Sequence, residues 1–193
     1  MKLFFLALTN HHIDQLLELC KNGNQLAQLE VYNRYYLAMY NSAIHIVKDP
    51  QEAEDVMQES FLTAFTKLHQ FHGDASFGAW LKRIVINKSI TKYRKQIVHA
   101  AVDLEKLLLE DDDNLTYSEI SYSEIKAKEV INCLSELKEN YRLILTLHYL
   151  EGYDYDEISE IMKMSYANCR TMLSRAKENL RKAFEKSKKE KIT

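Results

Sequence analysis

The 193-residue chain has very few residues that break helices or form turns: one Pro and four Gly. Of its residues 46% are hydrophobic and 28% are charged, a globular composition rich in helix formers. Its three cysteines are isolated and show no CxxC spacing. They therefore predict reduced thiols rather than a disulfide framework or a zinc site. We expect an all-α protein, and the reduced thiols favour a cytoplasmic location.

Motifs for catalysis and for membrane insertion are also missing from the sequence. The seven histidines form no HxxxH or HExxH pair, and there is neither a Gly-rich phosphate loop nor a GxSxG motif. The apolar stretch Leu3 to Leu8 is far too short to span a bilayer. We therefore predict no enzyme activity, no metal, no cofactor, no small-molecule substrate and no direct membrane insertion.

The charged residues form blocks that the formal net charge of −2 hides. Ala75 to Val102 holds six basic residues and no acid, whereas Asp103 to Glu129 holds nine acids against three lysines. From Arg170 to the end, nine Lys or Arg stand against three Glu. Like charges repel, so such blocks persist where solvent screens them or a partner uses them. Two separated basic helices suggest a polyanion that is contacted at two places.

Apolar residues recur at helical spacing along most of the chain. The pattern predicts helices over Ile13 to Lys21, Leu26 to Val47, Gln51 to His69, Phe77 to Ile97, Tyr122 to Leu137 and Glu139 to Leu150. Asp49 and Pro50 are typical of a helix start, and Glu52 stands where a capping box needs an acid. The acidic stretch from Asp103 to about Tyr122 has no such period and is predicted to be a linker.

The C-terminal segment has the layout of a helix-turn-helix. A short helix over Tyr155 to Met162 is followed by a tight turn and a longer basic helix over Tyr166 to about Lys186. Asp154 and Ser165 are the expected caps of the two helices. The predicted seam between them consists of Ile158, Ile161, Cys169 and Leu173. Polar residues of the second helix would then face outward.

Three motifs resemble those of bacterial sigma-70-family factors. The run AEDVMQESF (53–61) is similar to their core-binding motif. FGAWLKRIVIN (77–87), followed by YRK (93–95), is similar to their promoter-melting helix. YDEI (155–158) with NCRTMLSRA (168–176) resembles their C-terminal helix-turn-helix. The first two motifs form one block and the third forms another, and an acidic linker joins the two blocks. This is the layout of the extracytoplasmic-function (ECF) group, and the resemblance spans about Ile13 to Phe184.

The resemblance implies two small helical domains and a set of partners. Residues 11–98 would be sigma region 2, which binds core polymerase and the −10 element. Residues 99–121 would be the acidic linker, which can lie in the polymerase channel that later holds RNA. Residues 122–187 would be sigma region 4, which binds the −35 element. The implied partners are RNA polymerase core (through the β′ clamp coiled coil and the β flap), promoter DNA and an anti-sigma factor.

The resemblance also assigns roles to individual residues. Core-polymerase binding falls to Glu54, Asp55, Gln58, Glu59 and Phe61; −10 binding to His72, Trp80, Arg83, Asn87, Lys88, Thr91, Arg94 and Lys95; and −35 binding to Tyr166, Asn168, Arg170, Thr171, Ser174 and Arg175. The residues independently support parts of this assignment. The acids and Gln58 recur at three- and four-residue spacing and so share one helix face, and the cations suit backbone phosphates.

Each pattern also has a simpler interpretation. The acidic face could be a solvated helix surface, Trp80 could be a core residue, Asn87 could cap a helix, and the linker could serve solubility alone. The chain departs from the family at Lys138, Ser159 and Met172, and Met172 removes a possible phosphate or base contact. The rival functions are a stand-alone helix-turn-helix regulator and a protein-interaction module. The core-binding motif argues against the first, and the basic recognition helix argues against the second.

Overall fold

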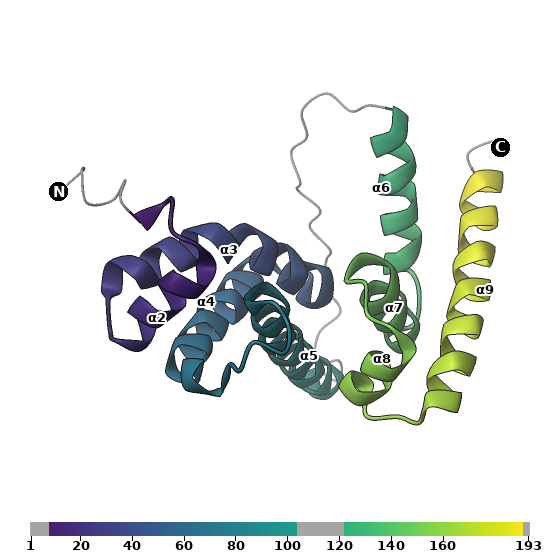
Figure 1. Cartoon of the computed structure of the whole chain (residues 1–193). Helices are drawn as coiled ribbons and strands as arrows, with labels where there is room; N and C mark the ends of the chain where they lie inside the picture. The colour runs from purple at the N-terminus through teal and green to yellow at the C-terminus, as the bar shows by residue number, and fades with distance from the viewer. Residues whose placement is uncertain (1–7, 104–121, 191–193) are drawn as a thin grey trace. The chain divides into compact units, whose positions relative to one another are not determined.

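The computed structural model describes residues 8–103 and 122–190. The described residues form helices and connecting turns, with no strand among them, which confirms the predicted all-α class. The chain divides into two compact units, Met1–Leu107 and Leu108–Thr193 (Figure 1). The predicted acidic linker lies outside the described residues except at its start, where a helix of the first unit continues to Asp103.

The described residues of the first unit form three long helices and a short one. They are α2 (Ile13–Lys21), α3 (Gln25–Val47), α4 (Pro50–Thr66) with the short 3₁₀ turn η1 (Leu68–Gln70), and α5 (Phe77–Asp103). Helices α3, α4 and α5 pack against one another, and α2 packs against α3 (Figure 1). Two predicted ends differ. The helix predicted to reach His69 gives way to η1 after Thr66, and α5 continues beyond Ile97.

Local chemistry sets the start of α4. Lys48 ends α3 with a φ of 65°, and the Asp49 side chain accepts a hydrogen bond from the Glu52 amide at 2.8 Å. Pro50 occupies the first helical turn, where a missing N–H costs nothing. The Glu52 carboxylate, expected to complete the capping box, lies 2.5 Å from Lys92 Nζ on α5. The sequence signal therefore predicted the helix start correctly, but Glu52 serves the contact between helices.

The buried stripe of α4 follows its apolar periodicity. Ala53, Val56, Met57, Phe61 and Ala64 are buried in the core of the first unit. The Phe61 ring packs against Tyr32 of α3 with ring centroids 4.8 Å apart. Because these residues hold one side of α4 in the core, the opposite side of the same helix faces solvent.

Arg34 of α3 fastens the chain that precedes α2. Its guanidinium donates to the carbonyl oxygens of Leu8 at 3.1 Å, Thr9 at 2.9 Å and His11 at 2.9 Å. Its Nε donates to the Glu30 carboxylate at 2.8 Å, and that carboxylate is buried. One side chain thus satisfies three backbone carbonyls and one buried charge.

The second unit contains the helix-turn-helix. Its elements are α6 (Tyr122–Ser135), α7 (Glu139–Leu145) continuing into the π-helical turn η2 (Thr146–Leu150), α8 (Tyr155–Met162) and α9 (Tyr166–Glu190). Helix α9 packs against α6, α7 and α8. The helix predicted over Glu139 to Leu150 is α-helical up to Leu145 and π-helical from Thr146 to Leu150.

The turn between α8 and α9 forms as its residues predict. Asp154 accepts from the Glu157 amide at 2.8 Å while the Glu157 carboxylate accepts from the Asp154 amide at 3.0 Å, a complete capping box. Lys163 ends α8 with a φ of 56°. Ser165 Oγ then accepts from the Asn168 amide at 3.3 Å. The predicted seam is buried, and its members are Ile158, Ile161, Cys169 and Leu173.

Candidate protein and nucleic-acid interfaces

The solvent side of α4 carries a continuous acidic face, which we define as Glu54, Asp55, Gln58 and Glu59. All four side chains are exposed, and Gln58 Nε2 donates to the Glu54 carboxylate at 3.0 Å. The buried stripe on the other side of α4 fixes the direction in which they point. Carboxylates on one rigid helix face can accept several hydrogen bonds from a basic partner helix at once.

Phe61 is not part of this exposed surface. It was assigned to core-polymerase binding, but it is only 3% exposed and packs against Tyr32 and Phe65. Its neighbour Leu62 is 68% exposed. The residue that extends the acidic face with an apolar side chain is therefore Leu62, and Phe61 instead holds α4 in the core.

Basic residues of α5 line a second surface of the first unit. Asn87, Thr91, Arg94 and Lys95 are exposed, and Arg83 and Lys88 are half-buried. The Thr91 hydroxyl donates to the Asn87 carbonyl oxygen at 2.8 Å, a bond that uses the backbone of Asn87 and not its side-chain amide. An exposed row of cations and one amide suits a nucleic-acid strand, with phosphates on the cations and a base edge on the amide.

Ion pairs connect α5 with α4. Lys88 Nζ lies 3.4 Å from Glu59, and Lys92 Nζ lies 2.5 Å from Glu52. The hydrogen bond to Glu52 raises the pKa of Lys92, and the charges of Glu52, Asp55 and Glu59 add to the increase against a lowering by burial. The acidic face and the basic surface therefore meet along the contact between the two helices.

Trp80 is held in an aromatic cluster rather than standing free. Its ring centroid lies 5.5 Å from that of Phe71 and 5.8 Å from that of Phe77, and Tyr35 of α3 contacts Phe77 edge-on at 5.4 Å. The Trp80 side chain is nevertheless only half-buried, and His72, which follows Phe71 in the chain, is exposed. Core packing buries part of the Trp80 side chain, and the exposed part is available to a ligand.

The outer side of α9 carries the residues predicted for −35 binding. All of them are exposed: Tyr166, Asn168, Arg170, Thr171, Ser174 and Arg175. The buried residues Cys169 and Leu173 hold the opposite side of the helix against the rest of the unit. Met172 is half-buried, so its side chain lies at the edge of this surface.

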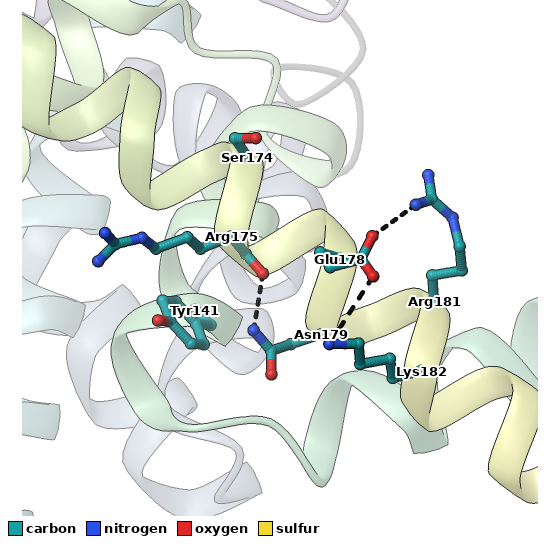
Figure 2. A pocket seen from close by; sticks show the side chains of 7 residues that line it. All are labelled: Tyr141, Ser174, Arg175, Glu178, Asn179, Arg181 and Lys182. Carbon is teal, nitrogen blue, oxygen red and sulfur yellow. Dashed lines mark hydrogen bonds and ion pairs between the residues drawn. The ribbon is translucent and has the colours of Figure 1, made fainter.

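Residues that the sequence analysis did not single out extend this surface. A cavity of about 660 Å³ lies between Tyr141 of α7 and α9 (Figure 2). Glu178 in its wall pairs with Arg181 at 2.6 Å and with Lys182 at 3.8 Å, and Asn179 Nδ2 donates to the Arg175 carbonyl oxygen at 2.8 Å. The cations beyond Arg175 could be read from the sequence, but the sequence did not show that Tyr141 of α7 lines the same cavity.

Aromatic rings pack together at the start of the helix-turn-helix, a contact that the sequence did not predict. The His148 ring stacks on Tyr155 at 5.3 Å, and Tyr155 meets Tyr166 edge-on at 5.9 Å. Lys177 Nζ lies 5.5 Å from the centre of the Tyr149 ring, and a hydrogen bond with Tyr149 raises the pKa of Lys177. The contact with Tyr155 positions Tyr166 at the beginning of α9.

The described residues offer neither a metal site nor a membrane span. Within residues 8–103 and 122–190 there is no group of three or more His, Cys, Asp or Glu that could hold a metal ion. Over the same part of the chain, every helix is too short or too polar to cross a membrane.

Family models match both units of the chain. Residues 31–97 match sigma-70 region 2, and residues 127–180 match sigma-70 region 4. The ECF RNA polymerase sigma factor SigM of Bacillus subtilis is 32% identical over 155 residues, which cover 80% of this chain and 93% of SigM. This chain belongs to the ECF sigma factors of the sigma-70 family. It is thus a transcription initiation factor that directs RNA polymerase to promoters, and a stand-alone regulator is not favoured.

A second curated relative is similar to this chain over nearly the full length of both proteins. The RNA polymerase sigma-H factor of Pseudomonas aeruginosa is 30% identical over 187 residues, covering 92% of this chain and 96% of that protein. Two solved structures share the fold: the sigma factor RpoE from Bartonella quintana in complex with the anti-sigma factor NepR, and CnrH in complex with the cytosolic domain of CnrY. Their TM-scores are 0.61 and 0.55, with 20% and 22% identity; they cover 81% and 88% of this chain, which in turn covers 95% of each.

Proposed function

We propose that this sigma factor divides its work between its two units. Residues 11–98 bind core polymerase and the −10 element, residues 122–187 bind the −35 element, and residues 99–121 link them. The observation that carries this proposal is the exposure of the acidic face on α4 together with the burial of that helix's apolar stripe. The chain supplies no catalysis of its own and acts in the cytoplasm, where polymerase and promoter DNA meet.

The acidic face is the proposed contact with the β′ clamp coiled coil of core polymerase. Asp55 and Glu59 accept charge-assisted hydrogen bonds from basic side chains of that partner, and Leu62 supplies an apolar contact. Reversing the charges of Asp55 and Glu59 to Lys should weaken co-purification with core polymerase and leave the helix content by circular dichroism unchanged.

A matched control is available on α2 for this experiment. Asp14 and Glu18 are exposed acids of the same unit outside the acidic face. Their reversal to Lys gives the same change of net charge and should leave core binding intact. Equal co-purification of the Asp55/Glu59 variant and the wild type would remove the acidic face from the polymerase interface.

The surface of α5 is the proposed site for the −10 element. Lys88, Arg94 and Lys95 neutralise phosphates, and the exposed part of Trp80 stacks on an unpaired base, which contributes about 1–3 kcal/mol. The loop before α5, with His72, captures a flipped base. Strand opening needs no hydrolysis, because binding the unpaired strand shifts the melting equilibrium. Replacing Arg94 and Lys95 with Gln should reduce permanganate reactivity of −10 thymines in the polymerase–promoter complex.

The recognition helix α9 is the proposed reader of the −35 element. Its early exposed residues would meet base edges in the major groove. Arg170→Ala should cost about 1–3 kcal/mol if Arg170 pairs with a base, and it should relax the sequence preference at one position. An equal loss for every −35 sequence would mean that Arg170 contacts only phosphate.

Core polymerase should turn two weak DNA contacts into one bivalent contact. The free chain carries two basic surfaces on an acidic tether and should bind promoter DNA poorly. Once polymerase fixes their spacing, affinity should rise, and its logarithm should fall with log salt by about 0.9 per neutralised phosphate. Titrating a promoter duplex with the chain, with and without core, tests this. Equal affinity and specificity in both titrations would favour a stand-alone regulator.

Two further partners complete the proposal. The second unit contacts the β flap of polymerase, and an anti-sigma factor binds the free chain. The anti-sigma factor in the RpoE–NepR structure supports the second partner class. Co-expression with proteins encoded beside this chain, followed by co-purification in the absence of polymerase, tests whether such an inhibitor exists.

A further inference from the structure

One ion pair between α4 and α5 links the two proposed interfaces of the first unit. Glu59 belongs to the acidic face proposed to bind polymerase, and Lys88 belongs to the surface proposed to bind the −10 strand. In the free chain their side chains pair at 3.4 Å. The neighbouring pair, Lys92 with Glu52 at 2.5 Å, joins the same helices but uses residues outside both assigned sets.

The exposure of the Glu59–Lys88 pair allows it to open. The two lysines are similarly exposed, Lys88 at 32% and Lys92 at 37%, but the Glu59 side chain is 63% exposed and that of Glu52 only 28%. Ion pairs in contact with solvent are weak, so another charged group can replace either partner at little cost. The Glu59–Lys88 pair can therefore exchange partners while buried apolar residues such as Val56 of α4 and Leu81 of α5 keep the helices together.

We propose that Glu59 is a shared ligand, which holds Lys88 away from DNA in the free chain and releases it when a cationic side chain of core polymerase binds the Glu59 carboxylate. The proposal rests on the interface assignments made above. Before polymerase binds, a DNA phosphate must compete with Glu59 for the Lys88 ammonium group. After polymerase binds, the carboxylate is occupied and the ammonium group is free.

The coupling must act in both directions. If polymerase binding at Glu59 strengthens the DNA contact of Lys88, then DNA at Lys88 strengthens the polymerase contact of Glu59 by the same factor. Polymerase-free sigma factor would thus be kept off nucleic acid by its own polymerase-binding residue. The acidic face then has two roles, one in the free chain and one in the holoenzyme.

The first test uses the free full-length chain and a fluorescein-labelled single-stranded DNA of mixed sequence. Glu59→Gln should raise the affinity about two- to fivefold and make the slope of log affinity against log salt steeper by about 0.7, the value for one additional phosphate on a single strand. Adding Lys88→Gln should cancel both changes. Glu54→Gln removes the same charge from the same face, but Glu54 is bonded to Gln58, so this control should change little.

The second test measures the coupling directly with Lys88→Gln. This variant should lose little DNA affinity as a free chain and about two- to fivefold in complex with core polymerase. Equal losses in the two states, or equal effects of Glu59→Gln and Glu54→Gln, would overturn the shared-ligand proposal even when polymerase binding is normal. Failure of the interface assignment is seen separately, because the Asp55/Glu59 co-purification experiment contains no DNA.

Discussion

Arg34 should make one of the largest single contributions to the stability of the first unit. Its guanidinium bonds to three carbonyl oxygens and to the Glu30 carboxylate, whose side chain is only 9% exposed. Removing one partner of a buried ion pair costs about 3–5 kcal/mol because a charge remains buried and unpaired. The Arg34 side chain is 28% exposed, and water can replace part of its bonding. We therefore expect Arg34→Met to cost about 3 kcal/mol, the low end of that range.

Thermal unfolding followed by circular dichroism measures this loss. A loss of about 3 kcal/mol in a unit of this size lowers Tm by about 12–24 °C. Glu30→Gln in the Arg34→Met background should recover part of the stability, since no unpaired charge is left. Lys21→Met is the control, because Lys21 pairs with Glu18 at 2.7 Å on the surface of α2 and exposed pairs contribute about 0.2–1 kcal/mol. If Arg34→Met lowers Tm no more than Lys21→Met, the hydrogen bonds of Arg34 do not contribute the expected stability.

The adjacent residues Phe61 and Leu62 should separate stability from binding: Phe61→Ala should cost about 3–5 kcal/mol on urea unfolding, whereas Leu62→Ala should weaken polymerase co-purification with little change in stability. Leu173 is 1% exposed on the buried side of α9, so Leu173→Ala should lower the free energy of unfolding by about 2–5 kcal/mol and abolish −35 duplex binding. Unchanged binding would show that the buried seam does not position α9 for DNA. Burial raises the Cys20 pKa from 9.0 to about 11, so its thiol should resist thiol reagents at pH 8 in the native state and react after unfolding. As the pH rises from about 9 to 11, the thiol ionises in the unfolded chain before it ionises in the folded chain, so the free energy of unfolding should fall. Cys20→Ala should lack this part of the pH dependence.

Features that depend on neighbouring residues were predictable from the sequence. The start of α4 at Asp49 and Pro50 and the capping box of α8 involve residues at most three positions apart. The seam of the helix-turn-helix follows from apolar residues at helical spacing, and so does the face that Glu54 to Glu59 share. Local hydrogen bonds and a fixed helical period determine such features, so a single sequence predicts them.

The tertiary structure alone decided which members of a motif are available to a partner. The helical period already placed Phe61 on the apolar stripe of α4, but the family motif also offered it to polymerase. Its packing against Tyr32 of another helix decides that Phe61 is buried, whereas the adjacent Leu62 is exposed. The same holds for the Lys88–Glu59 pair and the Tyr141 wall of the α9 cavity. These contacts join residues far apart in the chain, where helix packing rather than sequence spacing sets the distances. The sequence by itself therefore determined the helices, their caps and the family, whereas packing decided which side chains face one another and which face solvent.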